Sequence, residues 1–356
     1  MFHVMRNDSF NGTLEAQTAA RAVRERLPTG WSVEVRSRRG AGSTLALRAP
    51  DGREASLCVV VRKQVQPRDV PNLLRQAAER GERVLLLAPF LSPRARELLA
   101  EGKASYADAT GNLRIVASDP AIFLEGHGAD RDPVRQPRAL RSLKGPAAGR
   151  TVRALCDFAQ PYGVRALADV SSTPLGTVSR VVSFLEQEAI ITRDDSKRIV
   201  TVDWAALIVR WAKDYSVTGS NAVRSCLEPR GLGALGAKLG RLERYAITGS
   251  LAGTGIAPAR LAMLYVDDAA AAEEALELVP AEAGANVWLL QPFDEVVFER
   301  TETRPVASSP AAAAVVVAAP SQVAADLLTS PGRGPQEGEA LIERMKGAED
   351  DWRRSP

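Results

Sequence analysis

Histidine is nearly absent from this chain, and cysteine is scarce. The two histidines, His3 and His127, lie far apart in the sequence, so neither a histidine-based hydrolase nor a histidine-ligated metal centre is expected. The three cysteines, Cys58, Cys156 and Cys226, are odd in number and widely spaced. This usage fits reduced thiols in the cytosol and excludes a clustered zinc site.

Long apolar runs are also missing. The longest weakly polar stretch, residues 311–319, is too short to span a bilayer and is expected to form a buried strand or an alanine-rich loop. Residues 1–11 are mixed and polar, without the charged-then-apolar pattern of a secretion signal. We therefore expect a cytoplasmic protein with no membrane partner.

Charge of neither sign dominates. The 356 residues include 46 lysines and arginines and 43 aspartates and glutamates, which gives a net charge of +3. Composition alone therefore does not indicate a polyanion-binding protein, and any contact with nucleic acid must come from local placement of charge. A chain of this length is expected to form two or three domains, and its mixed helix and strand patterns indicate an α/β multidomain protein.

Residues 1–125 are predicted to form an α/β domain. Its elements follow the order helix, three strands, helix, strand, at residues 14–27, 31–35, 43–47, 55–61, 70–79 and 84–88. This order resembles the core of the PD-(D/E)XK nuclease-like fold. Residues 106–112 are expected to form a turn rather than a ligand-binding loop, with Gly111 supplying a positive φ.

The resemblance to nucleases is one of order and not of motif. Active members place a carboxylate on the second strand and a Glu-x-Lys on the third, where these groups hold a divalent metal. Lys63 fits the lysine, but Val61 stands where the glutamate would be, and residues 44–47 offer no carboxylate. We therefore expect a degenerate nuclease-like domain.

Residues 126–149 are predicted to form a linker. The segment holds three prolines, shows no apolar periodicity and is rich in basic residues: Arg131, Arg135, Arg138, Arg141 and Lys144. One interpretation is a solvated connector. The other is a basic arm that follows DNA phosphates beside the next domain, in which Arg141 and Lys144 would be contact residues.

Residues 150–215 are predicted to form a separate domain. Two short helices, a turn and a longer helix follow one another, at 150–158, 164–170, 171–173 and 174–188. Thr173 is expected to cap the long helix, which begins at Pro174, because threonine before proline is a strong helix-start signal. Apolar residues at helical spacing form its inward stripe: Val178, Val181, Val182 and Leu185.

The opposite face of this helix carries mostly small or hydrogen-bonding side chains and one arginine: Leu175, Gly176, Thr177, Ser179, Arg180 and Ser183. Small side chains let a helix lie close in a major groove while polar groups bond to base edges. The next segment is expected to form two strands around a charged turn, at 190–193 and 198–202. Arg193, Lys197 and Arg198 would reach phosphates there, although two aspartates in the turn weaken the positive field.

This arrangement resembles the winged helix-turn-helix regulators of bacteria over about sixty residues. The resemblance implies that the helix at 174–188 enters the major groove of double-stranded DNA, with Thr173 and the outward side chains facing it, and that the wing lies on phosphates. A homodimer would then bind a pseudo-palindrome with half-sites about one helical turn apart. The alternative is a winged helix that contacts only proteins.

Residues 216–346 return to an α/β pattern that resembles the nucleotidyltransferase-like fold. A Gly-Ser pair at 249–250 matches the turn of that family, which precedes a strand with an Asp-x-Asp pair that binds magnesium. In this chain the strand at 261–266 has no such pair, and Asp267 and Asp268 are adjacent at its far end. Because neighbouring side chains on a strand point to different sides, transferase catalysis is not expected.

Three stretches near the end of the chain, 319–328, 331–334 and 336–345, resemble the AbiEi-type antitoxins of type IV toxin–antitoxin systems. The resemblance covers residues 150–346 and implies a winged-helix transcription regulator whose partners include DNA and a cognate toxin. The chain departs from that family by the extra domain in front, which bears more on toxin neutralisation than on DNA binding. The tail at 347–356 is polar and is expected to fray.

The sequence therefore predicts a sequence-specific regulator that binds double-stranded DNA, acts without a cofactor or metal and is not an enzyme. Two alternatives stay open. One is a nuclease or nucleotidyltransferase that the winged helix targets to nucleic acid, and the other is an antitoxin surface that binds only proteins. Salt dependence separates the latter from a DNA-binding protein, because phosphate contacts make affinity fall steeply with ionic strength.

Overall fold

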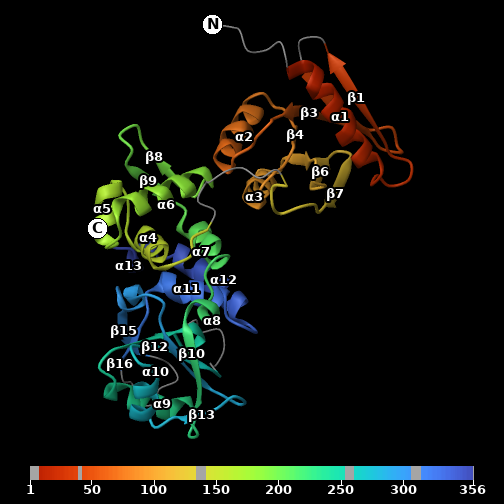
Figure 1. Cartoon of the computed structure of the whole chain (residues 1–356). Helices are drawn as coiled ribbons and strands as arrows, with labels where there is room; N and C mark the ends of the chain where they lie inside the picture. The colour runs from red at the N-terminus through yellow and green to blue at the C-terminus, as the bar shows by residue number, and fades with distance from the viewer. Residues whose placement is uncertain (1–7, 39–41, 134–141, 253–259, 306–313, 356) are drawn as a thin grey trace. The chain divides into compact units, whose positions relative to one another are not determined.

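The chain forms two compact units (Figure 1). The computed structural model describes residues 8–38, 42–133, 142–252, 260–305 and 314–355. The first unit is Met1–Ala139 together with Gln187–Ala189, and the second is Leu140–Glu186 with Ile190–Pro356. Each unit contains a seven-stranded sheet, so the protein is mixed α/β.

The first unit is built on a sheet whose strands lie side by side in sequence order, β1 to β7. Strands β1 to β3 pair antiparallel, β3 to β5 pair parallel, and β5 to β7 pair antiparallel. Its elements are α1 (Asp8–Arg24), β1 (Ser32–Arg38), β2 (Gly42–Arg48), β3 (Glu54–Val61), η1 (Pro67–Asp69), α2 (Val70–Glu79), β4 (Val84–Ala88), α3 (Pro93–Glu101), β5 (Ser105–Asp108), β6 (Leu113–Ser118) and β7 (Ala121–Gly126).

Helices cover both faces of this sheet, and strand β4 shows why. All five of its residues are buried. Leu85 and Leu87 pack in the cluster that contains α1, whereas Val84 and Leu86 pack in the cluster that contains α2 and α3. Successive side chains of a strand point to opposite faces, so a strand covered on both sides must be continuously apolar.

The order α1-β1-β2-β3-α2-β4 is the order that the sequence predicts. The predicted bounds of α2 are confirmed, whereas α1 begins and ends earlier than the predicted 14–27. The chain turns at the end of α1, where the backbone N–H groups of Arg26 and Leu27 donate to the carbonyls of Val23 and Arg24, three residues earlier.

The second unit begins with helices and a hairpin. These elements are α4 (Pro146–Asp157), α5 (Val164–Val170), α6 (Leu175–Gln187), β8 (Ile191–Arg193), β9 (Ile199–Val202), α7 (Trp204–Ala212) and α8 (Val217–Ser220). Strands β8 and β9 pair antiparallel, and Tyr162, between α4 and α5, forms a further bridge with Ile199 of β9.

A second sheet follows, in the order β13-β10-β14-β12-β11-β16-β15. Neighbours are antiparallel except the pairs β12–β14 and β11–β16, which are parallel. The elements are β10 (Ala222–Leu227), α9 (Leu232–Lys238), η2 (Leu239–Arg241), β11 (Tyr245–Thr248), η3 (Gly249–Ala252), β12 (Ala262–Val266), α10 (Ala269–Ala275), β13 (Val279–Pro280), β14 (Val287–Gln291), η4 (Glu295–Phe298), β15 (Glu302–Pro305), β16 (Ala314–Val317), α11 (Pro320–Leu328), α12 (Gly334–Lys346) and α13 (Glu349–Trp352).

The helical part of the second unit shares its apolar core with helices α11 and α12, while the sheet has an apolar core of its own. The core of α4 to α7 includes Ala324 and Ala325 from α11 and Ile342 and Met345 from α12. We refer below to residues 216–355 as the C-terminal block. The shared core holds this block against the helices that precede it.

Buried polar contacts reinforce that packing, and the first set is made by Arg153 of α4. Its side chain is fully buried and pairs with Asp157 one turn further along the helix. The guanidinium also donates to Gln322 Oε1 at 3.0 Å and to the backbone carbonyls of Val296 and Glu299. Such complete pairing is needed, because a buried charge without partners is strongly unfavourable.

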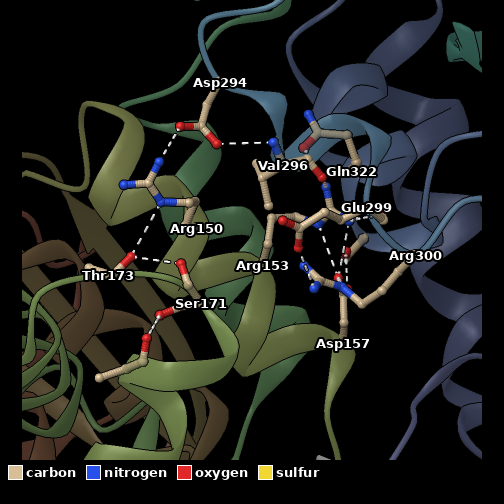
Figure 2. Close-up of polar contacts among 12 residues, drawn as sticks. Arg150, Arg153, Asp157, Ser171, Thr173, Asp294, Val296, Glu299, Arg300 and Gln322 are labelled. Atoms are coloured by element: carbon tan, nitrogen blue, oxygen red, sulfur yellow. Dashed lines mark hydrogen bonds and ion pairs between the residues drawn. The ribbon is translucent and has the colours of Figure 1, made fainter. Parts of the chain in front are cut away.

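Asp157 completes this contact from the other side (Figure 2). One carboxylate oxygen accepts from Arg300 Nε at 2.6 Å, and the other accepts from the hydroxyl of Ser321. We call the side chains of Arg153, Asp157, Arg300, Ser321 and Gln322, all buried except the partly exposed Arg300, the polar seam. The polar seam joins α4 to two parts of the C-terminal block, the start of α11 and the segment after η4.

A second buried cluster surrounds Asp326 of α11. Its carboxylate accepts hydrogen bonds from Tyr215 at 2.6 Å, Thr248 at 2.6 Å, Tyr265 at 2.8 Å and Gln322 at 2.9 Å. Burial raises the pKa of Asp326, and these four donors oppose that change. Because Tyr215 follows α7 while Thr248 and Tyr265 lie on strands, the cluster ties the helical part to the sheet.

Two sequence predictions about connecting segments are corrected here. The linker predicted at 126–149 ends earlier, because α4 begins at Pro146 and Leu143 is already fully buried. The predicted frayed tail is packed instead. Trp352 is 8% exposed and lies edge-on against Trp204, and Arg353 donates to the carbonyls of Cys156 and Phe158.

Candidate nucleic-acid interface

Helix α6 has one buried face and one exposed face. Its inward stripe is fully buried, at 0–1% exposure: Val178, Val181, Val182 and Leu185. These side chains belong to the core that α4, α5, α7 and the hairpin share. The stripe predicted from the sequence is therefore confirmed, and it fixes which side chains of α6 point outward.

We define the outer face of α6 by the six residues that the sequence places opposite the stripe: Leu175, Gly176, Thr177, Ser179, Arg180 and Ser183. Four of them are exposed, while Thr177 and Ser183 are half-buried. Leu175 is 46% exposed, which is high for a large apolar side chain. A methyl group added at Gly176 would meet no atom within 4 Å, so there is open space at this position in the first turn of α6.

Arg180 is the only charged residue of the outer face. Its guanidinium lies back along the helix, where Nε donates to the carbonyl of Gly176 and Nη2 donates to Thr177 Oγ1, both at 3.2 Å. Both contacts are exposed and neither involves an acid. An arginine held in this way keeps its positive charge available to an incoming acceptor.

Thr173 does not belong to the exposed surface, which corrects the sequence prediction. Its side chain is 5% exposed, and its hydroxyl donates to the carbonyl of Ser171 at 2.9 Å. The predicted contact with DNA is therefore blocked by burial. Helix α6 begins at Leu175, and the carbonyl of Pro174 accepts from the backbone N–H groups of Thr177 and Val178.

The hairpin turn between β8 and β9 presents two cations. Lys197 is exposed and has a positive φ of 63°. Arg198 is also exposed, and its guanidinium donates to the carbonyl of Pro161 at 3.1 Å. The carboxylate of Asp194 accepts from the backbone N–H of Arg198, so this acid shapes the turn.

Arg193 has a different environment from the one predicted. Its guanidinium makes a two-pronged ion pair with Glu186 of α6, and its side chain is only 20% exposed. The hydrogen bond to Glu186 raises the pKa of Arg193. A phosphate would have to compete with this carboxylate, so Arg193 acts first as a link between β8 and α6.

Two residues of the predicted basic arm are described, Arg131 and Lys144, and both are exposed. Lys144 is exposed just before α4, and its backbone N–H donates to Ser142 Oγ at 3.2 Å. Arg141 lies outside the residues that the structure describes. The side chain of Lys144 is thus available at the surface of the second unit.

Arg150, which no sequence pattern singles out, lies between Thr173 and Asp294 at this site (Figure 2). This residue of α4 is 28% exposed in its side chain and forms an ion pair with Asp294 at 2.7 Å. Its Nε also donates to Thr173 Oγ1 at 3.4 Å, directly before α6. In the sequence Arg150 is one residue in the ordinary amphipathic pattern of α4, and its acidic partner is 144 positions away.

The carboxylates considered as metal ligands have other partners. Asp267 pairs with Arg244, and Asp268 caps α10 by accepting from the N–H groups of Ala270 and Ala271. Within the described ranges there is no group of three or more His, Cys, Asp or Glu side chains placed to hold a metal ion.

Of the segment 106–112 in the first unit, predicted to be a turn, residues 106–108 belong to β5 and residues 109–112 form the turn. Asp108 accepts from the backbone N–H groups of Thr110 and Asn112, and Gly111 has a φ of 103°. Asn112 is 1% exposed and donates to Asp108 at 2.8 Å. These contacts account for the Asp, Gly and Asn of this segment in structural terms.

Comparison with protein families, with characterised proteins and with solved structures finds no match to this chain. None of the helices in the described ranges has the length and the apolar character that a bilayer crossing requires.

Proposed function

We propose that this chain binds double-stranded DNA in a sequence-specific way, through the outer face of α6, and acts as a transcription regulator. The order α4, Tyr162 bridge, α5, α6, β8, β9 supports a winged helix-turn-helix domain. In such a domain the helix after the turn enters the major groove, and the hairpin forms the wing. Helix α6 and the β8–β9 hairpin would take these two roles.

The observation that carries the proposal is the exposed first half of α6. Gly176 and Ser179 let the helix backbone come close to base edges, and Arg180 can offer two parallel donors to a guanine. Leu175, exposed beside them, suits contact with a thymine methyl group. Among the described residues no acid pairs with Arg180, so its guanidinium and the exposed Leu175 side chain are both free to meet a duplex.

The hairpin supports the same proposal in a smaller way. Lys197 and Arg198 are exposed at its turn, where they would contact phosphates on one side of the groove. The net charge of the chain is only +3, so binding depends on these local cations. Lys144 would add a third phosphate contact.

The resemblance to AbiEi-type antitoxins is part of this proposal at the level of class. The element order α1-β1-β2-β3-α2-β4 supports a nuclease-like scaffold in the first unit, and the Gly-Ser turn at the end of β11 supports a nucleotidyltransferase-like C-terminal block. A homodimer and a cognate toxin stay predictions of that resemblance.

The test is a selection of bound duplexes from a random pool with the full-length chain, followed by mobility shifts with the selected duplex. We expect one discrete complex that resists scrambled competitor and weakens by about tenfold or more between roughly 50 mM and 200 mM salt. A complex that competitor removes, or no complex, would contradict the proposal and favour a protein-binding module. Arg224→Ala, which removes an exposed arginine of the C-terminal block, serves as the control and should bind like the wild type.

A further inference from the structure

The start of α6 is held by a buried turn. Ser171 and Thr173 are 4% and 5% exposed, and the Thr173 hydroxyl donates to the Ser171 carbonyl. Backbone bonds from Ser171 to Leu167 and from Thr173 to Ala168 tie the turn to α5. The position of Leu175 and the residues after it therefore depends on this turn.

Arg150 connects the turn to a different part of the chain (Figure 2). Its Nη1 donates to Asp294 Oδ2 at 2.7 Å, while its Nε donates to Thr173 Oγ1 at 3.4 Å. Asp294 belongs to the C-terminal block and is 8% exposed in its side chain. A single arginine thus bridges a buried carboxylate and the hydroxyl two residues before α6.

Asp294 is itself fixed in place. Its other oxygen, Oδ1, accepts from the backbone N–H of Val296 at 3.0 Å and so caps η4. The preceding residue, Phe293, lies so close to α4 that a methyl group added at Gly149 would come within 3.0 Å of its ring. The backbone N–H of Phe293 donates to Asn221, which is 7% exposed. Neighbouring residues 293 and 294 therefore both rest on α4 at 149 and 150.

We infer that Asp294 is a positioning residue for the DNA-reading helix, acting through Arg150 and Thr173. The inference rests on the proposed function. Bidentate contacts to bases require a recognition helix to be placed to a fraction of an ångström, since hydrogen bonds weaken steeply with distance and angle. The C-terminal block supplies part of that placement through Asp294, whose side chain is 8% exposed, and Thr173 is also buried, at 5%.

The sign of the charge change makes the inference testable. Asp294→Asn removes a negative charge, so a general electrostatic effect would strengthen binding to a polyanion. The positioning role predicts the opposite: Arg150 loses its charged partner, its hold on Thr173 relaxes, and specific binding weakens by about fivefold or more. Thr173→Val should also weaken binding, although this side chain is too buried to touch DNA.

The experiment measures the affinity of the full-length chain for its selected duplex in four forms: wild type, Asp294→Asn, Thr173→Val and the double variant. Glu273→Gln is the matched control, because it removes the same charge from an ion pair with Arg224 elsewhere in the second unit. Thermal melting of each variant shows that binding is measured on folded protein. Thr173→Val leaves the ion pair between Arg150 and Asp294 intact and carries the test by itself if Asp294→Asn does not fold.

The expected result is weaker specific binding for both single variants, a double variant no weaker than the weaker single one, and Glu273→Gln at wild-type affinity or slightly tighter. Asp294→Asn binding like Glu273→Gln, or losses that simply multiply in the double variant, would overturn the inference while leaving the proposed function intact. A wild-type chain without a specific complex would instead contradict the proposed function, and this inference with it.

Discussion

Arg153 of the polar seam and Arg180 of the outer face of α6 have different surroundings. Arg153 is fully buried and bonds to a carboxylate, an amide and two backbone carbonyls. Arg180 is exposed, and its contacts are with one carbonyl and one hydroxyl of its own helix. The first arrangement leaves no donor for a ligand, whereas the second can exchange weak local partners for a base or a phosphate.

This difference separates residues that hold the second unit together from residues that could bind a partner. A buried charge pair is costly to disrupt, because the group left behind has no access to water. An exposed arginine can be removed at little cost in stability. Stability and DNA affinity should therefore respond to different substitutions, and the following predictions test that separation.

The largest effect is expected in the polar seam. Arg153→Met leaves the buried acceptors of Gln322, Val296 and Glu299 without their donor, so the free energy of unfolding should fall by about 3–5 kcal/mol. Urea denaturation measures this change. Arg224→Met, which breaks an ion pair whose arginine is 45% exposed, is the control and should cost about 1 kcal/mol or less. Similar losses of unfolding free energy in both variants would contradict the distinction between the buried and the exposed arginine.

On the outer face of α6 the expected effect is on affinity and not on stability. Arg180→Ala should weaken specific DNA binding by about 1–3 kcal/mol and relax the preference at one base pair. The unfolding free energy should change by less than about 0.5 kcal/mol, because the side chain is exposed. The measurement is a competition mobility shift with single-base variants of the selected duplex. An unchanged base preference would show that Arg180 reads no base.

A smaller effect is expected from Asp326, as a dependence of stability on pH. Because burial raises the pKa of Asp326, the folded protein binds this proton more tightly than the unfolded chain, whose aspartate has a pKa of about 3.9. The stabilisation from this group is present below that value and is lost as the pH rises through the folded pKa. In Asp326→Asn the free energy of unfolding should fall less steeply with rising pH, as measured by urea unfolding from pH 4 upward. A variant with the wild-type slope would show that another group titrates.

The smallest effect is expected in the hairpin. Lys197→Ala should weaken binding to all duplexes alike, by less than about 1 kcal/mol at physiological salt, and reduce the slope of log affinity against log salt by about 1. Asp195→Ala, at an exposed acid of the same turn, is the matched control and should strengthen binding slightly. Loss of base preference on substituting Lys197 would place the hairpin on base edges instead of phosphates.

The local parts of this fold could be predicted from the sequence. Helix α2, strand β4 and the inward stripe of α6 follow from apolar spacing and from start and stop residues within a few positions. The exposed residues of α6 follow from the same spacing, because a buried stripe fixes the opposite face.

The nonlocal contacts could not be predicted in this way. Asp294 meets Arg150 across 144 positions, and Arg353 meets Phe158 across 195. A polar tail such as 347–356 has the composition of a frayed end, yet its single tryptophan finds an aromatic partner in Trp204. The sequence likewise places Thr173 on the DNA surface although it is 5% exposed, because its burial depends on packing that a helix-start signal does not contain.

The most direct test of the central claim is a photo-crosslink from the outer face of α6 to DNA. A photoreactive phenylalanine analogue placed at Ser179 should crosslink to the selected duplex, and scrambled competitor should not remove the product. The same analogue at Val279, which is 49% exposed on β13, is the control and should give no product. Crosslinking at Val279 as strong as at Ser179, or none at Ser179 in a duplex that is bound, would contradict the assignment of α6 as the DNA-reading helix.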